Sequence, residues 1–164
     1  MPPSVSATLV ILQVALFGLF VITYFADSGP RLLPEGYAAD VLALAGAVLC
    51  ALAAALSFDA FLRLRRSFRV SPEPHRSGRL VREGVYRYLR HPMYNAVTLL
   101  CSGLVLRSPR WTTLAAAVAV VVLLALKARH EERLLAARYP EYAAYARGTV
   151  GVVPGMRANV GRPE

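Results

Sequence analysis

The sequence predicts an all-α, polytopic membrane protein with about four transmembrane helices. Hydrophobic residues make up 56% of the 164-residue chain and charged residues only 18%. The apolar residues occur in long blocks, and residues 4–26 carry no charge over 23 positions. A helix needs roughly 20 apolar residues to cross a bilayer, so this run is long enough. Composition and block length together favour a bilayer over a soluble core.

The first two expected helices lie in the N-terminal third of the chain. Residues 4–26 form the first, and the run lacks the basic start and cleavage signal of a signal peptide. The segment DSGPRLLPEG, with two prolines and two glycines, then interrupts the pattern. The second helix covers residues 41–58 and extends through Asp59 to Leu62, and FLRLRRSFRV (61–70) is expected to be its polar end, with arginines that reach lipid headgroups. Its glycine and many alanines suit close packing between helices in a membrane.

The next two apolar runs are shorter and form a helical hairpin. They cover residues 95–106 and 111–126, with RSPR as the turn between them. Residues 91–94 can lengthen the third helix at its start. The helical pattern of the fourth continues to about Arg138, where Tyr139-Pro140 should end it. A helix from Trp111 to Arg138 is roughly 42 Å long at 1.5 Å per residue, which exceeds the hydrocarbon core. The fourth helix should therefore project from the membrane into the cytoplasm.

The basic residues predict the orientation. With four crossings, one side holds only Arg31, Arg107 and Arg110, and the other holds sixteen of the nineteen. Basic residues mark the cytoplasmic side, so both termini and the 63–94 segment should be cytoplasmic. A basic surface facing anionic lipid accounts for the net charge of +9 without nucleic acid. We therefore expect a multi-pass protein of a bacterial inner membrane.

Several classes of site are disfavoured. Cys50 and Cys101 lie in separate apolar runs without a CxxC or other ligand spacing, so we read them as small buried thiols and expect no metal. The chain contains no P-loop, GxGxxG, HExxH or GxSxG motif. A soluble nucleotide-binding or hydrolase fold is therefore not indicated.

Two polar segments on the expected cytoplasmic side are candidates for a site. In GRLVREGVYRYLRHPMY, Pro92 suits the first turn of a helix, and Tyr86, Tyr88, His91 and Tyr94 would cluster at its start. The alternative to a site is a purely structural role, in which the tyrosines lie at the membrane interface and the arginines contact lipid headgroups. In KARHEERLLAARYPEY, Lys127 and Glu131 are i,i+4 neighbours on one helix face. They could belong to a site, or they could form an ordinary solvated ion pair. The later VGVVPGM could fold back against the bilayer or cover a pocket.

Together, GVYRYLRHPMY and EERLLAARYPEYAAY resemble the isoprenylcysteine carboxyl methyltransferase and phospholipid methyltransferase family of integral membrane enzymes. The resemblance covers roughly residues 60–155. It implies two N-terminal membrane helices (residues 1–62) followed by a methyltransferase core (63–164), with a cytoplasmic cofactor pocket. The chain departs from the family pattern at Ala96, where many members have glycine, and at RYPEY, which is shorter than the usual segment.

The resemblance also implies the donor, S-adenosylmethionine, and the residues around it. The family's substrate-side cation falls on Lys127, with Arg129 as a second candidate for positioning a substrate carboxylate. The expected donor contacts are Arg79, Leu80, Val81, Tyr86, His91, Pro92, Met93, Tyr94 and Glu131.

These residue types fit methyl transfer. Adenine can stack on tyrosine or histidine, and a carboxylate such as Glu131 can offset the charge of the sulfonium. A carboxylate acceptor is already ionised at neutral pH, so its methylation needs alignment and exclusion of water rather than a base. A lipid amine must first lose a proton, and only His91 is an evident base.

We therefore expect O-methylation of an isoprenylcysteine-type carboxylate, with a phospholipid amine as the alternative. The acceptor would be a lipophilic small molecule or a lipid. A non-enzymatic four-helix scaffold is the contrasting class. Membrane sterol reductases end in similar motifs and would predict a nicotinamide cofactor instead.

Overall fold

The structure is a computed structural model that describes residues 5–26, 29–67 and 82–152. Its elements are the helices α1 (Val5–Phe25), α2 (Tyr37–Ser67), α3 (Pro92–Arg107), α4 (Trp111–Arg138) and α5 (Tyr142–Arg147), with one 3-10 turn, η1 (Gly84–Arg87). Among the described residues, β-type pairing is limited to two isolated bridges, Arg31 with Arg110 and Leu89 with Val150. The all-α fold class is therefore confirmed.

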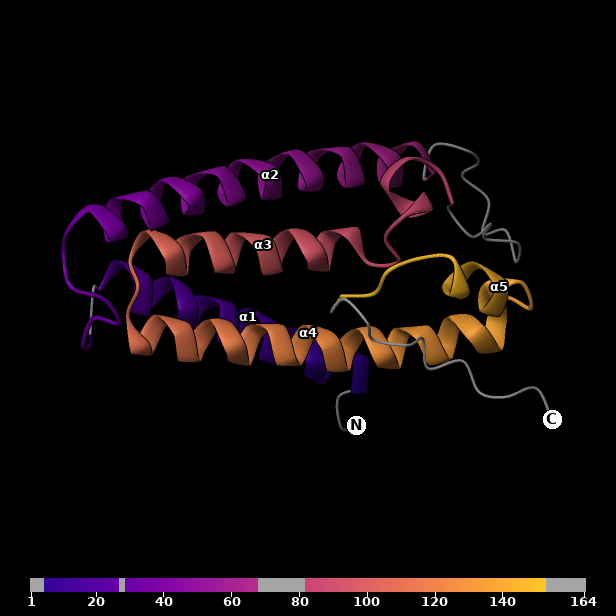
Figure 1. Cartoon of the computed structure of the whole chain (residues 1–164). Helices are drawn as coiled ribbons and strands as arrows, with labels where there is room; N and C mark the ends of the chain where they lie inside the picture. Colours follow the sequence, from indigo (N-terminus) through magenta and orange to yellow (C-terminus); the bar gives the residue numbers. More distant parts are fainter. Residues whose placement is uncertain (1–4, 27–28, 68–81, 153–164) are drawn as a thin grey trace.

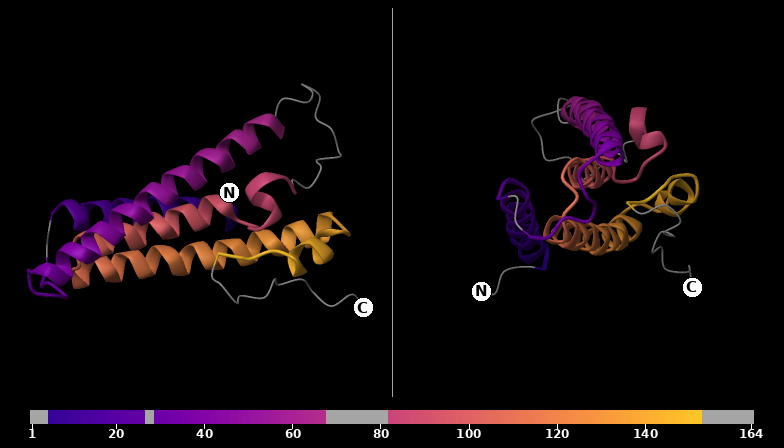
Figure 2. Two further views of the ribbon diagram at one scale, coloured as in Figure 1. Left: turned by 45° about the horizontal axis from the view of Figure 1, so that its top comes forward. Right: turned by 60° about the vertical axis from the view of Figure 1, so that its left-hand side comes forward.

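The long helices run lengthwise beside one another, and η1 and α5 lie at one end (Figure 1). α2 packs mainly on α3, and α1 packs on α4. Seen end-on, α3 lies between α2 and α4, and α1 flanks α4 (Figure 2). Phe20 of α1, Cys101 of α3 and Val120 and Leu124 of α4 are almost fully buried members of one apolar core. Both cysteines are free thiols. Cys101 is buried as expected, whereas Cys50 is only partly buried.

The helix bounds follow the sequence closely for α1 and α4, and α4 begins at Trp111 and ends at Arg138 as predicted. α2 is longer than the apolar run, because good helix formers continue the helix on both sides. α3 starts at Pro92, whose fixed φ and missing N–H suit the first helical position.

Three helices are long and apolar enough to cross a membrane. These spans are Ala7–Phe25, Tyr37–Arg63 and Trp111–Arg138. α3 has 16 residues, or about 24 Å at 1.5 Å per residue, which is less than the roughly 30 Å hydrocarbon core. Three of the four expected spans are thus confirmed as helices that are long and apolar enough to cross.

Close contact between α2 and α3 depends on a pair of glycines. A Cβ added at Gly103 would lie 2.7 Å from the Gly46 carbonyl oxygen and 2.8 Å from Cys50 Sγ. Small residues allow such close backbone approach between membrane helices. The small residues seen in the second apolar run therefore serve the contact between α2 and α3.

We expect Gly103→Ala to destabilise the protein by about 1–3 kcal/mol, because the methyl group has no room at this contact. The matched control is Gly18→Ala, since a Cβ at Gly18 meets nothing within 4 Å. That change should be neutral or stabilising, because alanine is the better helix former. Melting temperatures in detergent compare the two variants, and equal melting temperatures would contradict the glycine contact.

At the end away from η1 and α5, the two connectors pair with each other. Leu32 N donates to Pro109 O at 2.8 Å, and Arg110 Nη1 donates to Gly29 O at 2.6 Å. A cavity of about 450 Å³ lies beside them, lined by residues that include Arg31, Asp40 and Arg107. The expectation that the 27–40 and 107–110 connectors share one side is thus confirmed for the described residues.

Candidate active site

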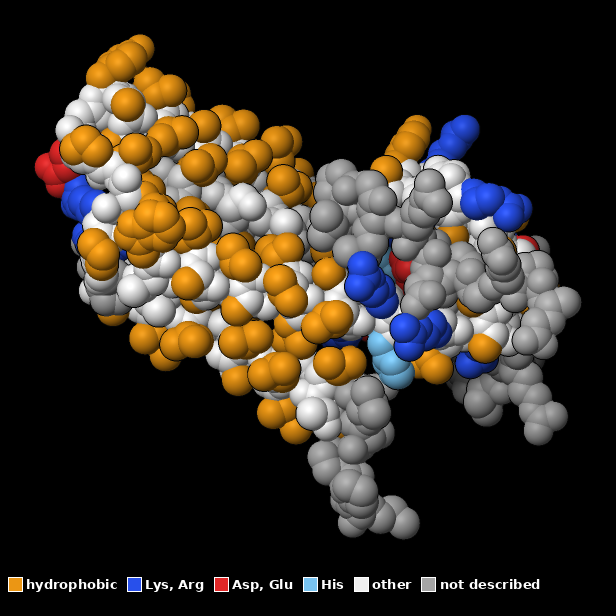
Figure 3. Space-filling view, turned by 60° about the horizontal axis from the view of Figure 1, so that its bottom comes forward, with side chains coloured by type: hydrophobic (Ala, Val, Ile, Leu, Met, Phe, Trp, Pro, Cys, Tyr) orange, Lys and Arg blue, Asp and Glu red, His pale blue; other side chains and the backbone are white. Residues whose placement is uncertain are grey.

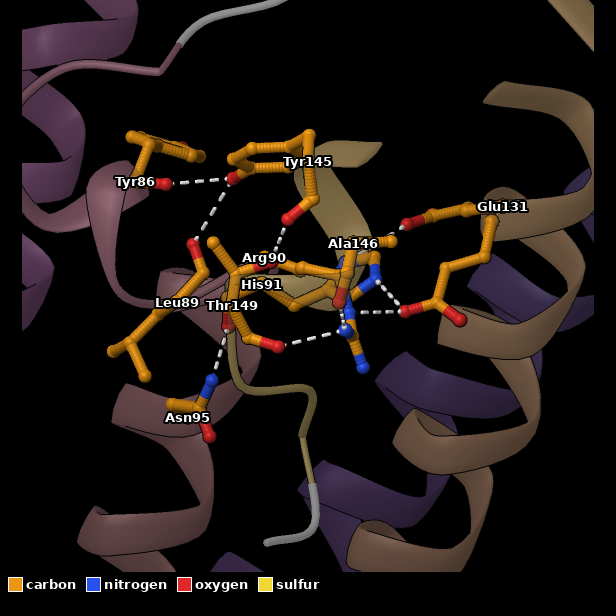
Figure 4. Close-up of polar contacts among 10 residues, drawn as sticks. Tyr86, Leu89, Arg90, His91, Asn95, Glu131, Tyr145, Ala146 and Thr149 are labelled. Carbon is orange, nitrogen blue, oxygen red and sulfur yellow. Dashed lines mark hydrogen bonds and ion pairs between the residues drawn. The ribbon is translucent and has the colours of Figure 1, made fainter. Parts of the chain in front are cut away.

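Segments distant in sequence meet at the opposite end of the bundle. Leu89 and Val150 form a parallel bridge, in which Arg90 N donates to Val150 O at 2.9 Å and Val150 N donates to Tyr88 O at 2.8 Å. The chain after α5 therefore returns to the segment that precedes α3. Gly151 and Val152 are buried there, so the described part of the VGVVPGM segment folds back onto the core. Figure 4 shows the side chains that gather around this return.

Arg90 and Glu132 form an ion pair inside this junction. Arg90 Nε lies 2.8 Å from Glu132 Oε1, and each side chain is only 3% exposed. Arg90 Nη1 also donates to the carbonyl oxygens of Ala146 at 2.5 Å and Thr149 at 2.8 Å (Figure 4). One guanidinium thus joins α4 to the end of α5 and to the returning chain. Such charge-assisted bonds are the strong ones in a protein interior.

His91, Tyr94 and Glu131 form a second group beside the ion pair. The His91 and Tyr94 rings are stacked, with centroids 5.3 Å apart and planes 6° apart. Tyr94 Oη donates to Glu131 Oε1 at 2.6 Å. His91 Nδ1 lies 3.7 Å from Glu131 Oε2, and its Nε2 lies 3.4 Å from Glu132 Oε1. The start of α3, with its partial positive charge, therefore lies against both carboxylates of α4.

Burial differs sharply within this group. Glu132 and His91 are buried, whereas 37% of the Glu131 side chain is exposed. Tyr142 is also buried, and its hydroxyl has no hydrogen-bond partner among the described residues. Burial, together with the negative charge of nearby Glu132, raises the pKa of Tyr142. The site thus combines an accessible carboxylate with buried polar atoms that still have hydrogen-bonding capacity.

Tyr145 fixes the segment before α3. Its hydroxyl donates to Tyr86 O at 2.7 Å and lies 3.5 Å from Leu89 O (Figure 4). Burial raises the pKa of Tyr145 to about 12 and also raises the pKa of Tyr86. Tyr145 therefore stays protonated at neutral pH and keeps donating this bond.

Lys127 lies one turn before Glu131 but does not pair with it. No carboxylate of the described residues is within 4 Å of Lys127 Nζ. The ammonium lies 5.3 Å from the centroid of the Tyr94 ring and donates to Gln13 Oε1 of α1 at 2.7 Å. The solvated Lys127–Glu131 ion pair that the i,i+4 spacing suggested is therefore absent. Lys127 is a half-buried cation with an aromatic and an amide neighbour.

The structure brings together most of the site residues expected from sequence. His91, Pro92, Tyr94, Glu131 and Lys127 lie in one group, with Tyr86 on the adjoining η1. Met93 is at the same helix start but is 40% exposed. Arg129 is exposed on α4, without a hydrogen bond or ion pair to the described residues. Arg79, Leu80 and Val81 lie outside the described residues.

Sequence reasoning missed Arg90, Glu132, Tyr142 and Gln13. Arg90 and Glu132 stand directly beside His91 and Glu131, so adjacency within the two motifs was the available signal. Tyr142 and Tyr145 had only their i,i+3 spacing. Gln13 is a single amide in an apolar helix, and nothing local indicates that it meets Lys127.

The chain was compared with family models, with curated proteins and with solved structures, and the match came from the family models. A family model described as phospholipid methyltransferase matches residues 41–142. The match includes most of α2 and all of η1, α3 and α4, and it leaves α1 and nearly all of α5 outside. No curated protein and no solved structure matches the chain.

Proposed function

Since this chain belongs to the phospholipid methyltransferase family and is an S-adenosylmethionine-dependent methyltransferase of the membrane, we propose that it methylates the carboxylate of an isoprenylcysteine-type lipid. The single observation that supports an anionic lipid acceptor is the Lys127 ammonium, and a carboxylate is preferred to an amine because it needs no base. It lies one helical turn from the candidate donor residues and has no carboxylate partner among the described residues. A half-buried cation in this position favours an acceptor with an anionic group.

The residues of the site fit the donor. The unpartnered hydroxyl of buried Tyr142 and the Nε2 atom of His91 are polar atoms that lack hydrogen bonds among the described residues. Buried polar groups are normally satisfied, so a ligand with several polar atoms is expected there. We propose that Glu131, which is partly exposed, accepts hydrogen bonds from the donor, and that the His91–Tyr94 pair offers a flat face for adenine.

S-adenosylmethionine, when bound, supplies a methyl group on a positively charged sulfur. The partly exposed carboxylate of Glu131 favours that charge, whereas the charge of Glu132 is already paired with that of Arg90. Lys127 would hold the acceptor carboxylate in line with the methyl group, which is the alignment that this reaction requires. A carboxylate oxygen needs no base to attack, so none of these residues has to move a proton.

A phospholipid amine remains the alternative acceptor, because Lys127 could equally hold its phosphate. The ammonium must then lose a proton, and His91 and Glu131 are the nearest groups that could take it. His91 lies 3.7 Å from Glu131 and 3.4 Å from Glu132, and neighbouring carboxylates support a histidine as a base, so the acceptor assay decides between the two acceptors.

We also propose that α3 crosses the membrane as a short fourth span and that the site is cytoplasmic. Hydrophobic side chains cover most of the length of the molecule, and Lys and Arg gather toward the end that carries the site (Figure 3). A bilayer can thin locally around a short helix at modest cost. The positive-inside rule supports the cytoplasmic assignment.

The acceptor is tested by transfer of a labelled methyl group from S-adenosylmethionine in proteoliposomes. We expect label in N-acetyl-farnesylcysteine, released as methanol by alkali because the product is a methyl ester. Farnesylcysteine methyl ester, whose carboxylate is blocked, should take up none. Alkali-stable label in phosphatidylethanolamine would contradict the carboxylate assignment and support the amine.

Lys127→Met should raise the KM for the carboxylate acceptor by about 10- to 100-fold, because a hydrogen bond to a charged group contributes about 1.5–3 kcal/mol. Binding of S-adenosylhomocysteine, measured by calorimetry, should change little. Arg129→Met is the matched control, since Arg129 is exposed on the same helix. A larger effect of the Arg129 variant would move the acceptor cation from Lys127 to Arg129.

A further inference from the structure

Gln13 is the one amide in α1, and it faces α4. The α1 sequence VSATLVILQVALFGLFVITYF has no charged residue. Gln13 is half-buried, and its Oε1 accepts the 2.7 Å hydrogen bond from Lys127 Nζ. The bond connects residues 114 positions apart in the chain. It is therefore a tertiary contact and not a consequence of local helix structure.

Both partners lie within candidate membrane spans, Ala7–Phe25 and Trp111–Arg138. Lys127 is sixteen residues after the start of α4, which is about 24 Å along the helix. Gln13 is twelve residues before the end of α1, or about 18 Å. Both distances are shorter than the roughly 30 Å hydrocarbon core. With the core beginning at Trp111, Lys127 lies toward its other boundary, where the ammonium can reach the polar end of a lipid.

Packing of α1 on α4 does not need this amide. Phe20 is fully buried in the core, and Leu16, Phe17 and Val21 pack against the same cluster. These apolar residues lie on the α1 face that meets α4. A leucine at position 13 could continue that surface, so association of the helices leaves the choice of glutamine unexplained.

The geometry at Lys127 supplies the explanation. An ammonium group has three donors, and the bond to Gln13 uses one of them. The Tyr94 ring covers another side of the ammonium at 5.3 Å. The amide oxygen is neutral, so it fixes Nζ without cancelling its charge. A carboxylate in the same place would neutralise Lys127.

We propose that Gln13 is a positioning residue that holds Lys127 ready for the anionic group of the lipid acceptor. This inference rests on the proposed function. It also gives α1, which lies outside the family match, a part in the acceptor site. A neutral partner is required at position 13, because it must orient the cation and leave its charge for the acceptor.

Gln13→Glu and Gln13→Leu test the proposal in proteoliposomes. With N-acetyl-farnesylcysteine as acceptor, we expect Gln13→Leu to raise KM several-fold, because Lys127 loses its orientation. Gln13→Glu should raise KM at least tenfold, because its carboxylate competes with the acceptor for Lys127. In both variants kcat and the Kd of S-adenosylhomocysteine should stay close to wild type. Val14→Leu, on a lipid-exposed neighbour, is the matched control.

Two outcomes would overturn the proposal. One is wild-type KM in both variants. The other is a loss of S-adenosylhomocysteine binding equal to the loss of activity, which would make Gln13 a structural residue. If the wild-type protein labels phosphatidylethanolamine instead, the carboxylate assignment fails, and the same KM comparison on that phospholipid still decides the role of Gln13.

Discussion

Arg90→Ala is expected to destabilise the protein by about 3–5 kcal/mol, the usual cost of leaving one member of a buried ion pair without its partner. Glu132 would keep its charge in a place where only 3% of its side chain is exposed. The carbonyl oxygens of Ala146 and Thr149 would also lose their donor. The melting temperature in detergent should fall sharply, and the chain after α5 should become sensitive to protease.

A second ion pair of the same site region serves as the control. Arg82 Nη2 lies 3.8 Å from Glu141 Oε1, and the two side chains are 44% and 50% exposed. Exposed pairs contribute about 0–1 kcal/mol, so Arg82→Ala should change the melting temperature little. The double variant Arg90→Met/Glu132→Leu should recover part of the lost stability, because no charge is then left buried alone. Equal effects of Arg82→Ala and Arg90→Ala would contradict the role given to Arg90.

The second large effect concerns donor binding. Glu131→Ala and His91→Ala should each weaken S-adenosylhomocysteine binding at least about tenfold, since each removes a contact made by a charged or stacked group. Glu131 is the accessible carboxylate of the site, and His91 stacks on Tyr94. Calorimetry on the purified protein measures both Kd values.

His130→Ala is the matched control, because His130 is adjacent to Glu131 in sequence but makes no hydrogen bond or ion pair with the described residues. Its Kd should equal that of wild type. Melting temperatures separate lost binding from lost folding. Wild-type affinity in both the Glu131 and the His91 variants would remove them from the donor site.

Local patterns in the sequence predicted much of the fold. Residues 111–138 could be read as one helix because helical periodicity continues past the apolar run until Tyr139-Pro140 stops it. Pro92 likewise marked the start of α3. The first turn of α2, residues 37–40, was missed, because it directly follows the proline- and glycine-containing connector. The arginine-rich extension after Leu62 was predicted as the polar end of this helix.

The site was predicted less completely, because its decisive contacts are tertiary. Lys127 and Glu131 looked like an i,i+4 pair, but Tyr94 from α3 bonds Glu131, and Gln13 from α1 bonds Lys127. Nothing in a single sequence shows that Arg90 and Glu132 bury each other's charge. The choice of acceptor stays a proposal for the same reason, since it depends on what the Lys127 ammonium meets.

The proposed function depends most on where the donor binds, and photolabelling measures this directly. Irradiation of the protein with methyl-labelled S-adenosylmethionine, followed by trypsin, should place label in the peptide of residues 91–107, near His91 and Tyr94. Excess S-adenosylhomocysteine should prevent the labelling. Label within residues 33–43 of the peptide 32–63, which line the cavity at the other end of the bundle, would contradict the proposed site.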